Sequence, residues 1–279
     1  MKNILKTALI ILSAITVVAC ACEPCKATQK QARKVGVQMY TFHKYTFEDS
    51  IPMLKKVGVS NVGLTGGQKL SKKYPKKINP SLNAEERAYL KKLIADNGLT
   101  PVSYGVYYAN DENAVKKACE FAKEMGIPMI LTEAPANLLP AWEKYCGEYG
   151  IKMAIHNHAK DSKANNYYDP NVVKNLIKDY KNIYACPDNG HWSRSGIDAV
   201  KGYKILEGKI AILHFKDQKE FGNPKNQCVP FGTGALDMKA MLAELDRQNF
   251  DGYFLIEYEA KWEDNLADVA ECVKYLRNN

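Results

Sequence analysis

The stretches IAILH at residues 210–214 and YFLIE at residues 253–257 decide the fold. Each is a short apolar run that ends in a side chain able to bind a metal, His214 in the first and Glu257 in the second. An acid or imidazole at the end of a buried strand is costly unless something neutralises it. A divalent metal bound at one rim of a parallel β-barrel would neutralise such side chains. The active sites of these barrels lie at the C-terminal ends of the strands, where both side chains stand.

Two further apolar runs end in the same way. Residues 183–188 read IYACPD and end at Asp188, and residues 128–133 read PMILTE and end at Glu133. Oxygen-rich sites with an imidazole suit Mn²⁺, Mg²⁺, Co²⁺ or Zn²⁺. We therefore expect one divalent metal ion as the cofactor.

Around these runs the chain alternates between strand-like segments and segments with apolar residues at helical spacing. The expected strands are residues 35–41, 61–65, 101–108, 128–133, 152–158, 183–188, 210–216 and 252–258. The expected helices are residues 48–57, 84–97, 112–125, 137–149, 172–180, 197–206, 236–248 and 265–277. About eight strand–helix pairs, with nearly continuous apolar strands, predict an α/β fold of the (β/α)8 TIM barrel type. A doubly wound open sheet is the main alternative, but no G-x-G-x-x-G follows the first strand.

The N-terminus has the pattern of an export signal. Lys2 and Lys6 precede an apolar stretch at residues 8–18, and Val17-Val18-Ala19-Cys20 resembles a bacterial lipobox. The pattern predicts a lipoprotein signal peptide at residues 1–19, a polar tether at 20–33 and a catalytic barrel at 34–279. Cys20 would be lipidated, and the protein would be exported and anchored in the periplasm or on the surface of a bacterium. An ordinary signal peptide and a retained anchor are the alternatives.

Composition narrows the class further. The chain is 46% hydrophobic with a formal charge of +8, but its lysines are not interleaved with aromatic residues as in a nucleic-acid groove. Nucleic acid is therefore not an expected partner, and the lipid anchor is the only expected link to a membrane. Of the eight cysteines, five are scattered beyond residue 100, which indicates small buried hydrophobes rather than a disulfide framework.

Polar residues gather at the expected strand ends, and all five histidines are among them. They are Tyr40, His43, Tyr107, Tyr108, Glu133, His156, Asn157, His158, Asp188, His191, His214, Lys216, Asp217, Glu257 and Glu259. The expected substrate-binding residues are His158, His191, Lys216, Tyr108 and His43. Each also has a plainer interpretation, such as a rim ion pair for Lys216 or simple packing for Tyr108.

From about Val35 to Leu276 the chain resembles the xylose isomerase-like barrel superfamily of sugar and sugar-phosphate isomerases and epimerases. The motifs that carry the resemblance are DNGH at 188–191, LHFKD at 213–217, VPFGTGA at 229–235 and GYFLIE at 252–257. Matched residue by residue, the resemblance implies Asp188, His214 and Glu257 as metal ligands. Where the family commonly has Glu-Asn-His, this chain has His156-Asn157-His158. Glu133 is then the expected fourth metal ligand, and His156 or His158 is the alternative.

The resemblance implies a sugar isomerase or epimerase that removes a proton next to a sugar carbonyl through an enediolate. Glu133 and Glu257 are the expected catalytic carboxylates, facing each other across the substrate. Export favours a neutral or keto-sugar, because phosphorylated sugars are scarce outside the cytoplasm. A metal-dependent hydrolase or lyase on the same barrel, and a non-catalytic carbohydrate-binding surface lipoprotein, are the alternatives.

Overall fold

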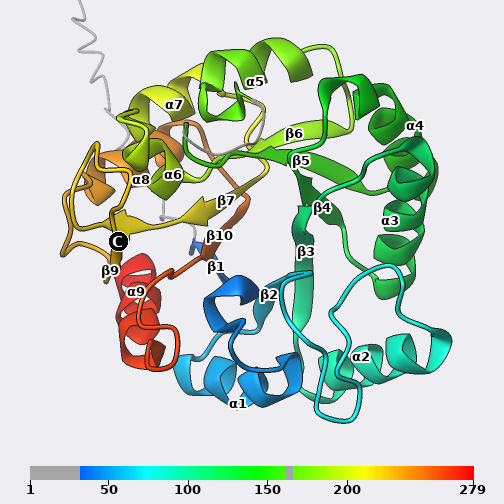
Figure 1. The fold of residues 1–279 in the computed structure, drawn as a ribbon. Helices are drawn as coiled ribbons and strands as arrows, with labels where there is room; N and C mark the ends of the chain where they lie inside the picture. The colour runs from blue at the N-terminus through cyan, green and yellow to red at the C-terminus, as the bar shows by residue number, and fades with distance from the viewer. Residues whose placement is uncertain (1–31, 161–165) are drawn as a thin grey trace, which may run out of the picture. The chain divides into compact units, whose positions relative to one another are not determined.

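The computed structural model describes residues 32–160 and 166–279, which form one compact unit, Ala32–Asn279. Eight parallel strands lie in the order β6-β5-β4-β3-β2-β1-β10-β7 and curve into a nearly closed barrel (Figure 1). The predicted TIM barrel is confirmed. The strands are β1 (Lys34–Gln38), β2 (Asn61–Leu64), β3 (Thr100–Tyr107), β4 (Met129–Thr132), β5 (Lys152–His156), β6 (Ile183–Cys186), β7 (Ile212–Phe215) and β10 (Tyr253–Ile256). The predicted signal peptide, Cys20 and most of the tether lie outside the described residues.

The barrel closes between β6 and β7, where two isolated parallel bridges replace a continuous ladder. Ala185 pairs with Ile210, and Asp188 pairs with His214. The His214 amide donates to the carbonyl of Pro187 at 3.1 Å. The closure therefore brings two of the expected metal ligands side by side.

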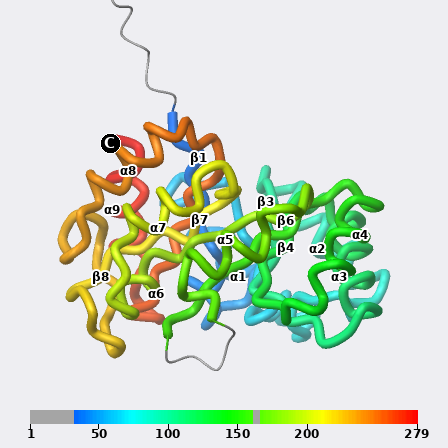
Figure 2. The backbone as a smooth tube through the Cα atoms, turned by 90° about the horizontal axis from the view of Figure 1, so that it is seen from above, coloured from blue at the N-terminus to red at the C-terminus, as the bar shows by residue number. Residues whose placement is uncertain are grey.

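Helices surround the barrel, as Figures 1 and 2 show from two directions. They are α1 (Phe47–Val57), α2 (Ala84–Asp96), α3 (Glu112–Met125), α4 (Leu139–Tyr149), α5 (Pro170–Ile177), α6 (Asn189–Arg194), α7 (Ala199–Ile205), α8 (Met238–Arg247) and α9 (Leu266–Asn278). Most begin at a polar side chain that accepts from a backbone amide; Thr46 does so for α1 and Asp111 for α3. Gly58 and Gly126 then end these two helices at φ 69°, a conformation that glycine adopts without strain.

Several short elements were not predicted. In the part of the chain that the structure describes, three 3₁₀ helices follow strands or precede helices: η1 (Met39–Phe42), η2 (Ala136–Leu138) and η3 (Asn166–Tyr168). Helix α6 was missed because it is too short for a hydrophobic period to show in the sequence. The two-residue strands β8 (Asp217–Gln218) and β9 (Cys228–Val229) pair antiparallel beyond the end of β7.

The apolar residues form two separate cores. The larger lies between strands and helices, and includes Leu213 and Phe254. The smaller is made by residues inside the barrel, among them Ile212 and Leu255. Because side chains alternate along a strand, neighbours in sequence contribute to different cores.

The five cysteines beyond residue 100 are all buried, as expected of small hydrophobes. Within the described part of the chain, none of the helices has both the length and the apolar character needed to cross a bilayer.

Candidate active site

Alternation along β7 and β10 decides which polar side chains enter the barrel. Ile212 and Leu255 belong to the inner core. His214 and Glu257 lie two residues further along the same strands, so they point inward as well. Tyr258 packs in the outer core, and Glu259 faces the cavity again, which continues the same alternation.

A fully buried lysine holds the acidic side of the site together. The Lys216 ammonium lies 2.8 Å from Asp188 Oδ2, 2.7 Å from Glu257 Oε2 and 3.3 Å from Glu259 Oε2. Burial alone would lower the pKa of Lys216, but these carboxylates outweigh it and raise the pKa well above its usual range. Burial opposes ionisation of Asp188 and Glu257, yet Lys216 brings both pKa values below their usual ranges. The site is therefore a compact group of opposite charges.

Asp188 uses its two oxygens for different purposes. Oδ1 accepts from the His191 backbone amide at 2.9 Å and caps helix α6. Oδ2 faces the buried group, 3.4 Å from His156 Nε2 and 3.8 Å from His214 Nδ1. Asp188 can therefore cap the helix with one oxygen and still offer the other to a metal.

His156 connects the acidic side to a second carboxylate. The register of β4 and β5 pairs Thr132 with Ile155, which places Glu133 level with His156. His156 Nδ1 lies 2.7 Å from Glu133 Oε1, and the His158 ring contacts the same oxygen. Burial raises the pKa of Glu133, but the two imidazoles bring it down to about 2. Burial lowers the pKa of His156, whereas Asp188 and Glu133 raise it to about 9.

The geometry groups the possible metal ligands differently from the first expectation. One group is His156, Asp188, His214 and Glu257, with candidate ligand atoms within 4.8 Å of one another. Glu133 belongs to another group, with His156 and His158. His156 therefore occupies the place beside Asp188, and Glu133 holds its far ring nitrogen.

The chemistry of this donor set fits a divalent transition metal. His214 is fully buried, and although its Nδ1 lies 3.0 Å from Glu257 Oε2, neither ring nitrogen makes a hydrogen bond of good geometry among the described residues. A buried polar atom without a hydrogen bond is uncommon. Two imidazoles with two carboxylates suit Zn²⁺, Mn²⁺ or Co²⁺ better than Mg²⁺.

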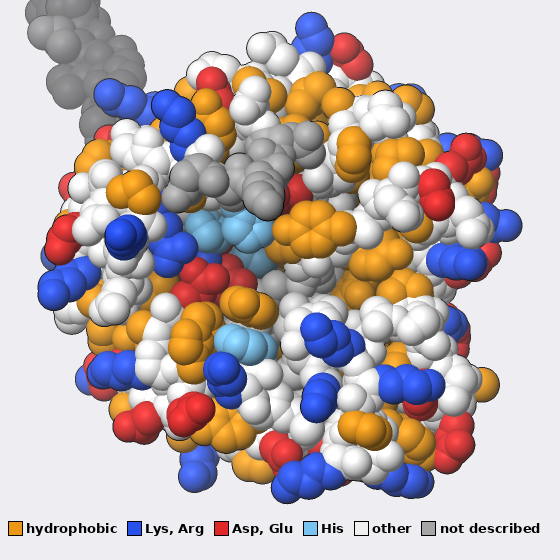
Figure 3. All heavy atoms as spheres, in the orientation of Figure 1, with side chains coloured by type: hydrophobic (Ala, Val, Ile, Leu, Met, Phe, Trp, Pro, Cys, Tyr) orange, Lys and Arg blue, Asp and Glu red, His pale blue; other side chains and the backbone are white. Residues whose placement is uncertain are grey.

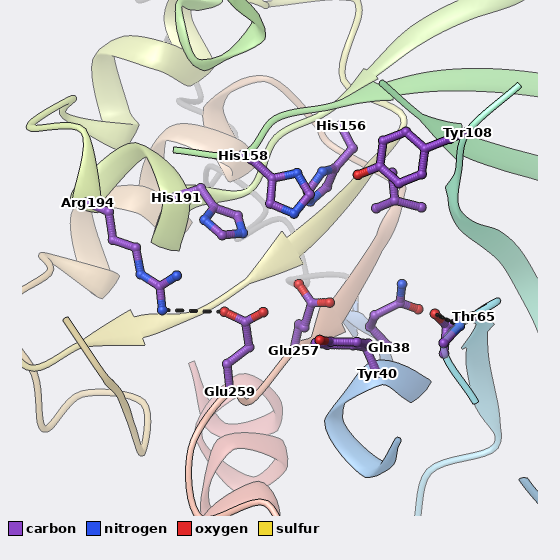
Figure 4. A pocket seen from close by; sticks show the side chains of 12 residues that line it. Gln38, Tyr40, Thr65, Tyr108, His156, His158, His191, Arg194, Glu257 and Glu259 are labelled. Atoms are coloured by element: carbon purple, nitrogen blue, oxygen red, sulfur yellow. Dashed lines mark hydrogen bonds and ion pairs between the residues drawn. The ribbon is translucent and has the colours of Figure 1, made fainter. Parts of the chain in front are cut away.

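A cavity of about 490 Å³ opens above this group, a size that suits a small-molecule site. Figure 3 shows it as a hollow in which histidine and acidic side chains meet, while most of the lysines and arginines visible in this view lie nearer the outline of the molecule. Figure 4 shows His158, His191 and Glu257 pointing into it, with Tyr108 at one side. The lining residues are Gln38, Tyr40, Thr65, Gly67, Val106, Tyr108, His156, His158, His191, Arg194, Glu257 and Glu259.

The expected substrate-binding residues occupy different places. His158, His191 and Tyr108 line the cavity, and Tyr108 is 60% exposed. Lys216 is 1% exposed and is not part of the lining. His43 stands behind Tyr40, with the two rings stacked at 4.4 Å.

Five cavity residues were not predicted from the sequence, namely Gln38, Thr65, Gly67, Val106 and Arg194. Strand alternation over Gly36-Val37-Gln38 turns Gln38 toward the barrel interior, so this residue could have been predicted from the sequence. Arg194 comes from the unpredicted helix α6, and its Nη2 lies 3.5 Å from Glu259 Oε2. No sequence pattern pointed to that pair.

The loop at residues 229–235 is anchored rather than loose. Asp217 Oδ2 accepts from the amides of Gly232 and Gly234 at 2.9 and 3.0 Å. Phe231 is buried in the outer core against Phe215. None of the loop residues lines the cavity.

Comparisons place this geometry among known proteins. Residues 53–278 match the family described as "Xylose isomerase-like TIM barrel". An inosose dehydratase of Clostridium perfringens (strain 13 / Type A) is 25% identical over 126 residues, 40% of this chain and 42% of that protein. The Escherichia coli (strain K12) protein SgbU, provisionally named an L-ribulose-5-phosphate 3-epimerase, is 31% identical over 94 residues, 32% of this chain and 33% of that protein. The matched part spans less than half the length of each relative.

Solved structures agree on the fold. An uncharacterized protein of Parabacteroides distasonis ATCC 8503 superposes with a TM-score of 0.71 at 28% identity, covering 88% of this chain and 98% of that one. The 3-keto-D-glucoside 4-epimerase YcjR of E. coli gives 0.67 at 16% identity, with 88% and 100% covered. The IolI protein, solved with a zinc atom, gives 0.70 at 16% identity, with 87% and 96% covered.

Proposed function

Because the chain belongs to the xylose isomerase-like TIM barrel family, we propose that it is a divalent-metal-dependent sugar isomerase or epimerase. The observation that carries the proposal is the group of His156, Asp188, His214 and Glu257, buried beneath a cavity of small-molecule size. The names of the relatives, epimerase and dehydratase, support a sugar-modifying enzyme. The zinc-containing neighbour supports a divalent ion.

The metal would be held by His156, Asp188, His214 and Glu257. When bound, it polarises the sugar carbonyl and stabilises the negative charge left by removal of the neighbouring proton. Glu133 would orient His156 by accepting from its far nitrogen, as outer carboxylates commonly do for metal-bound histidines. Glu133 would therefore orient a metal ligand and would not bind the metal itself.

Two groups can move the substrate proton. Glu257 lines the cavity, and Lys216 and His214 lower its pKa, which keeps the carboxylate ionised. His158 points into the same cavity from the other side (Figure 4), while Glu133 holds its Nδ1. Glu133 itself is 3% exposed and does not line the cavity, so His158 is the group that reaches the substrate. Glu133 would act through it, as a carboxylate orients a catalytic imidazole.

The charges favour a neutral or keto-sugar as substrate. Glu257 and Glu259 face the cavity, and the Arg194 guanidinium is already paired with Glu259. Among the described lining residues, a phosphate group would meet two carboxylates and no unpaired lysine or arginine. Sugar hydroxyls, in contrast, can donate to those same carboxylates.

The test is incorporation of solvent deuterium. Neutral aldoses and keto-sugars are incubated in D₂O with the protein, with and without Mn²⁺, and carbon-bound deuterium is measured by NMR. We expect metal-dependent exchange next to the carbonyl, together with an isomer or epimer. Absence of exchange across the panel, with metal loaded, contradicts the proposal.

Dehydration is the second candidate, favoured by the inosose dehydratase relative. It begins with the same proton removal, after which the neighbouring hydroxyl leaves as water. His158 is placed to protonate that leaving oxygen, since it lines the cavity. Mass spectrometry separates the two reactions, because only dehydration lowers the product mass by one water. A hydrolase would consume water without carbon-bound deuterium, and a binding protein would only shift its melting temperature with sugar.

We further propose that the protein is an exported lipoprotein anchored through Cys20. The support is the sequence pattern at residues 1–20. Mass spectrometry of the membrane fraction checks it, since the mature N-terminus should be a lipidated Cys20. Cys20→Ser should abolish both processing and lipid attachment.

A further inference from the structure

Three aromatic rings form a cluster beside the cavity, which we call the rim cluster: Tyr40, His43 and Trp262. The Tyr40 and His43 rings stack at 4.4 Å with planes 11° apart. The Trp262 ring meets them edge-on, at 4.6 Å from His43 and 5.7 Å from Tyr40. His43 Nδ1 contacts the Tyr40 carbonyl at 2.7 Å, which holds the stack in one orientation.

The rim cluster meets the proposed reaction site through Tyr40, which His43 and Trp262 contact from outside the cavity lining. Tyr40 lines the cavity next to Glu257 (Figure 4). Burial, then the charges of Glu259 and Glu257, raise the pKa of Tyr40, which keeps its hydroxyl protonated. A ligand that reaches Glu257 therefore has the Tyr40 side of the cluster within its reach.

Trp262 is not used as a core residue. The other two tryptophans, Trp142 and Trp192, are 0% and 1% exposed, whereas Trp262 is only partly buried. An indole that stays partly exposed beside a cavity offers a rigid apolar surface and a hydrogen-bond donor to a ligand. On the other side of the same cavity Tyr108 is 60% exposed.

The charged side chains of the cavity indicate which class of ligand would pack against these rings. Arg194 is the one lysine or arginine among the described residues that line the cavity, and it pairs with Glu259. Among the described lining residues, no other lysine or arginine is left to pair with an anionic group. A neutral ring with apolar C–H faces and hydroxyl donors matches aromatic surfaces flanked by carboxylates. The cavity volume of about 490 Å³ also lies within the range of about 300–1,000 Å³ that is usual for pockets holding drug-sized ligands.

We propose that the rim cluster is a subsite for a second ring, so that the substrate is a glycoside or the end of an oligosaccharide. This rests on the proposed function, because it assumes that the first ring lies over Glu257. The reacting ring occupies the histidine and carboxylate end, and the neighbouring ring packs at Trp262. A free hexose would leave that surface uncovered.

The test compares D-glucose with cellobiose and maltose by saturation-transfer NMR and titration, on wild type, Trp262→Ala, Trp262→Phe and Phe221→Ala. Phe221 is the matched control, since it is 51% exposed and lines a different depression. A two-ring sugar should bind wild type about 2- to 12-fold more tightly than glucose, the range of one aromatic contact. Trp262→Ala should remove this preference, Trp262→Phe should keep part of it, and Phe221→Ala should not change it.

The two proposals fail separately. Equal binding of one- and two-ring sugars to wild type, or an equal loss for both in Trp262→Ala, overturns the subsite. A preserved two-ring preference without deuterium exchange leaves the subsite standing and removes the isomerase. Melting temperatures of the variants show whether a loss of binding reflects unfolding.

Discussion

The two halves of the barrel interior differ sharply, although the same strands build both. Ile212 and Leu255 fill the half nearer the strand starts with a dry apolar core. His214 and Glu257, about 6.6–6.8 Å further along the same strands, face the same interior and carry the polar group. A shift of two residues along the same strand therefore separates side chains that stabilise the fold from side chains proposed to take part in the reaction. The apolar half should be probed by unfolding, the polar half by activity and metal binding.

The largest expected effect is on chemistry in the polar half. Glu257→Gln keeps the size of the side chain and one oxygen ligand but removes the base. Solvent-deuterium exchange should fall about 10²- to 10⁴-fold, the usual contribution of a general base. Circular dichroism should show an intact fold. Glu271→Gln, a change at an exposed position of α9, is the control and should exchange at the wild-type rate. Wild-type exchange in Glu257→Gln would remove this residue from the mechanism.

The apolar half should respond in the opposite way. Leu255 is fully buried, and a Cβ on Gly36 would lie 2.6 Å from its Cδ2, so the two pack tightly. Leu255→Ala should lower the free energy of unfolding by about 2–5 kcal/mol, measured by denaturant titration. Below the transition, exchange should stay within a few-fold of wild type. A large loss of exchange with unchanged stability would show that the halves are not separable.

A smaller effect, on metal affinity, tests the role of Glu133 in the polar half. If Glu133 orients His156 rather than binding the ion, Glu133→Gln should weaken Mn²⁺ or Zn²⁺ binding by about 10- to 100-fold. Isothermal titration measures this directly. His214→Ala provides the comparison, because it deletes a proposed ligand and should cost more. An equal loss in both variants would instead indicate that Glu133 is a direct ligand.

The smallest effect is a pH dependence of stability in the presence of a chelator. The pKa of Glu133 falls from 4.5 to about 2 on folding, so its contribution is complete above 4.5 and disappears as the pH falls through 2. The pKa of His156 rises from 6.5 to about 9, so its contribution is complete below 6.5 and disappears as the pH rises through 9. The melting-temperature difference between wild type and Glu133→Gln should therefore be largest between about pH 4.5 and 6.5. A difference that does not vary with pH would contradict the pairing.

The strands and main helices could be predicted because their signals are local. Apolar runs ending in polar residues marked β7 and β10, and apolar residues at helical spacing marked helices such as α3. Helix α6 and the β8–β9 pair were missed, since six- and two-residue elements carry no measurable period. Arg194, positioned by α6, was missed with them.

The sequence by itself determined the barrel, the inward direction of His214 and Glu257, and their place at the C-terminal rim. These follow from the two-residue period of a strand, which every strand carries in its own residues. Tertiary structure alone decided that His156 lies beside Asp188 while Glu133 stands behind it. It also decided that Lys216 is buried among three carboxylates. Such distances depend on strand register and on the closure between β6 and β7, and no single strand encodes either.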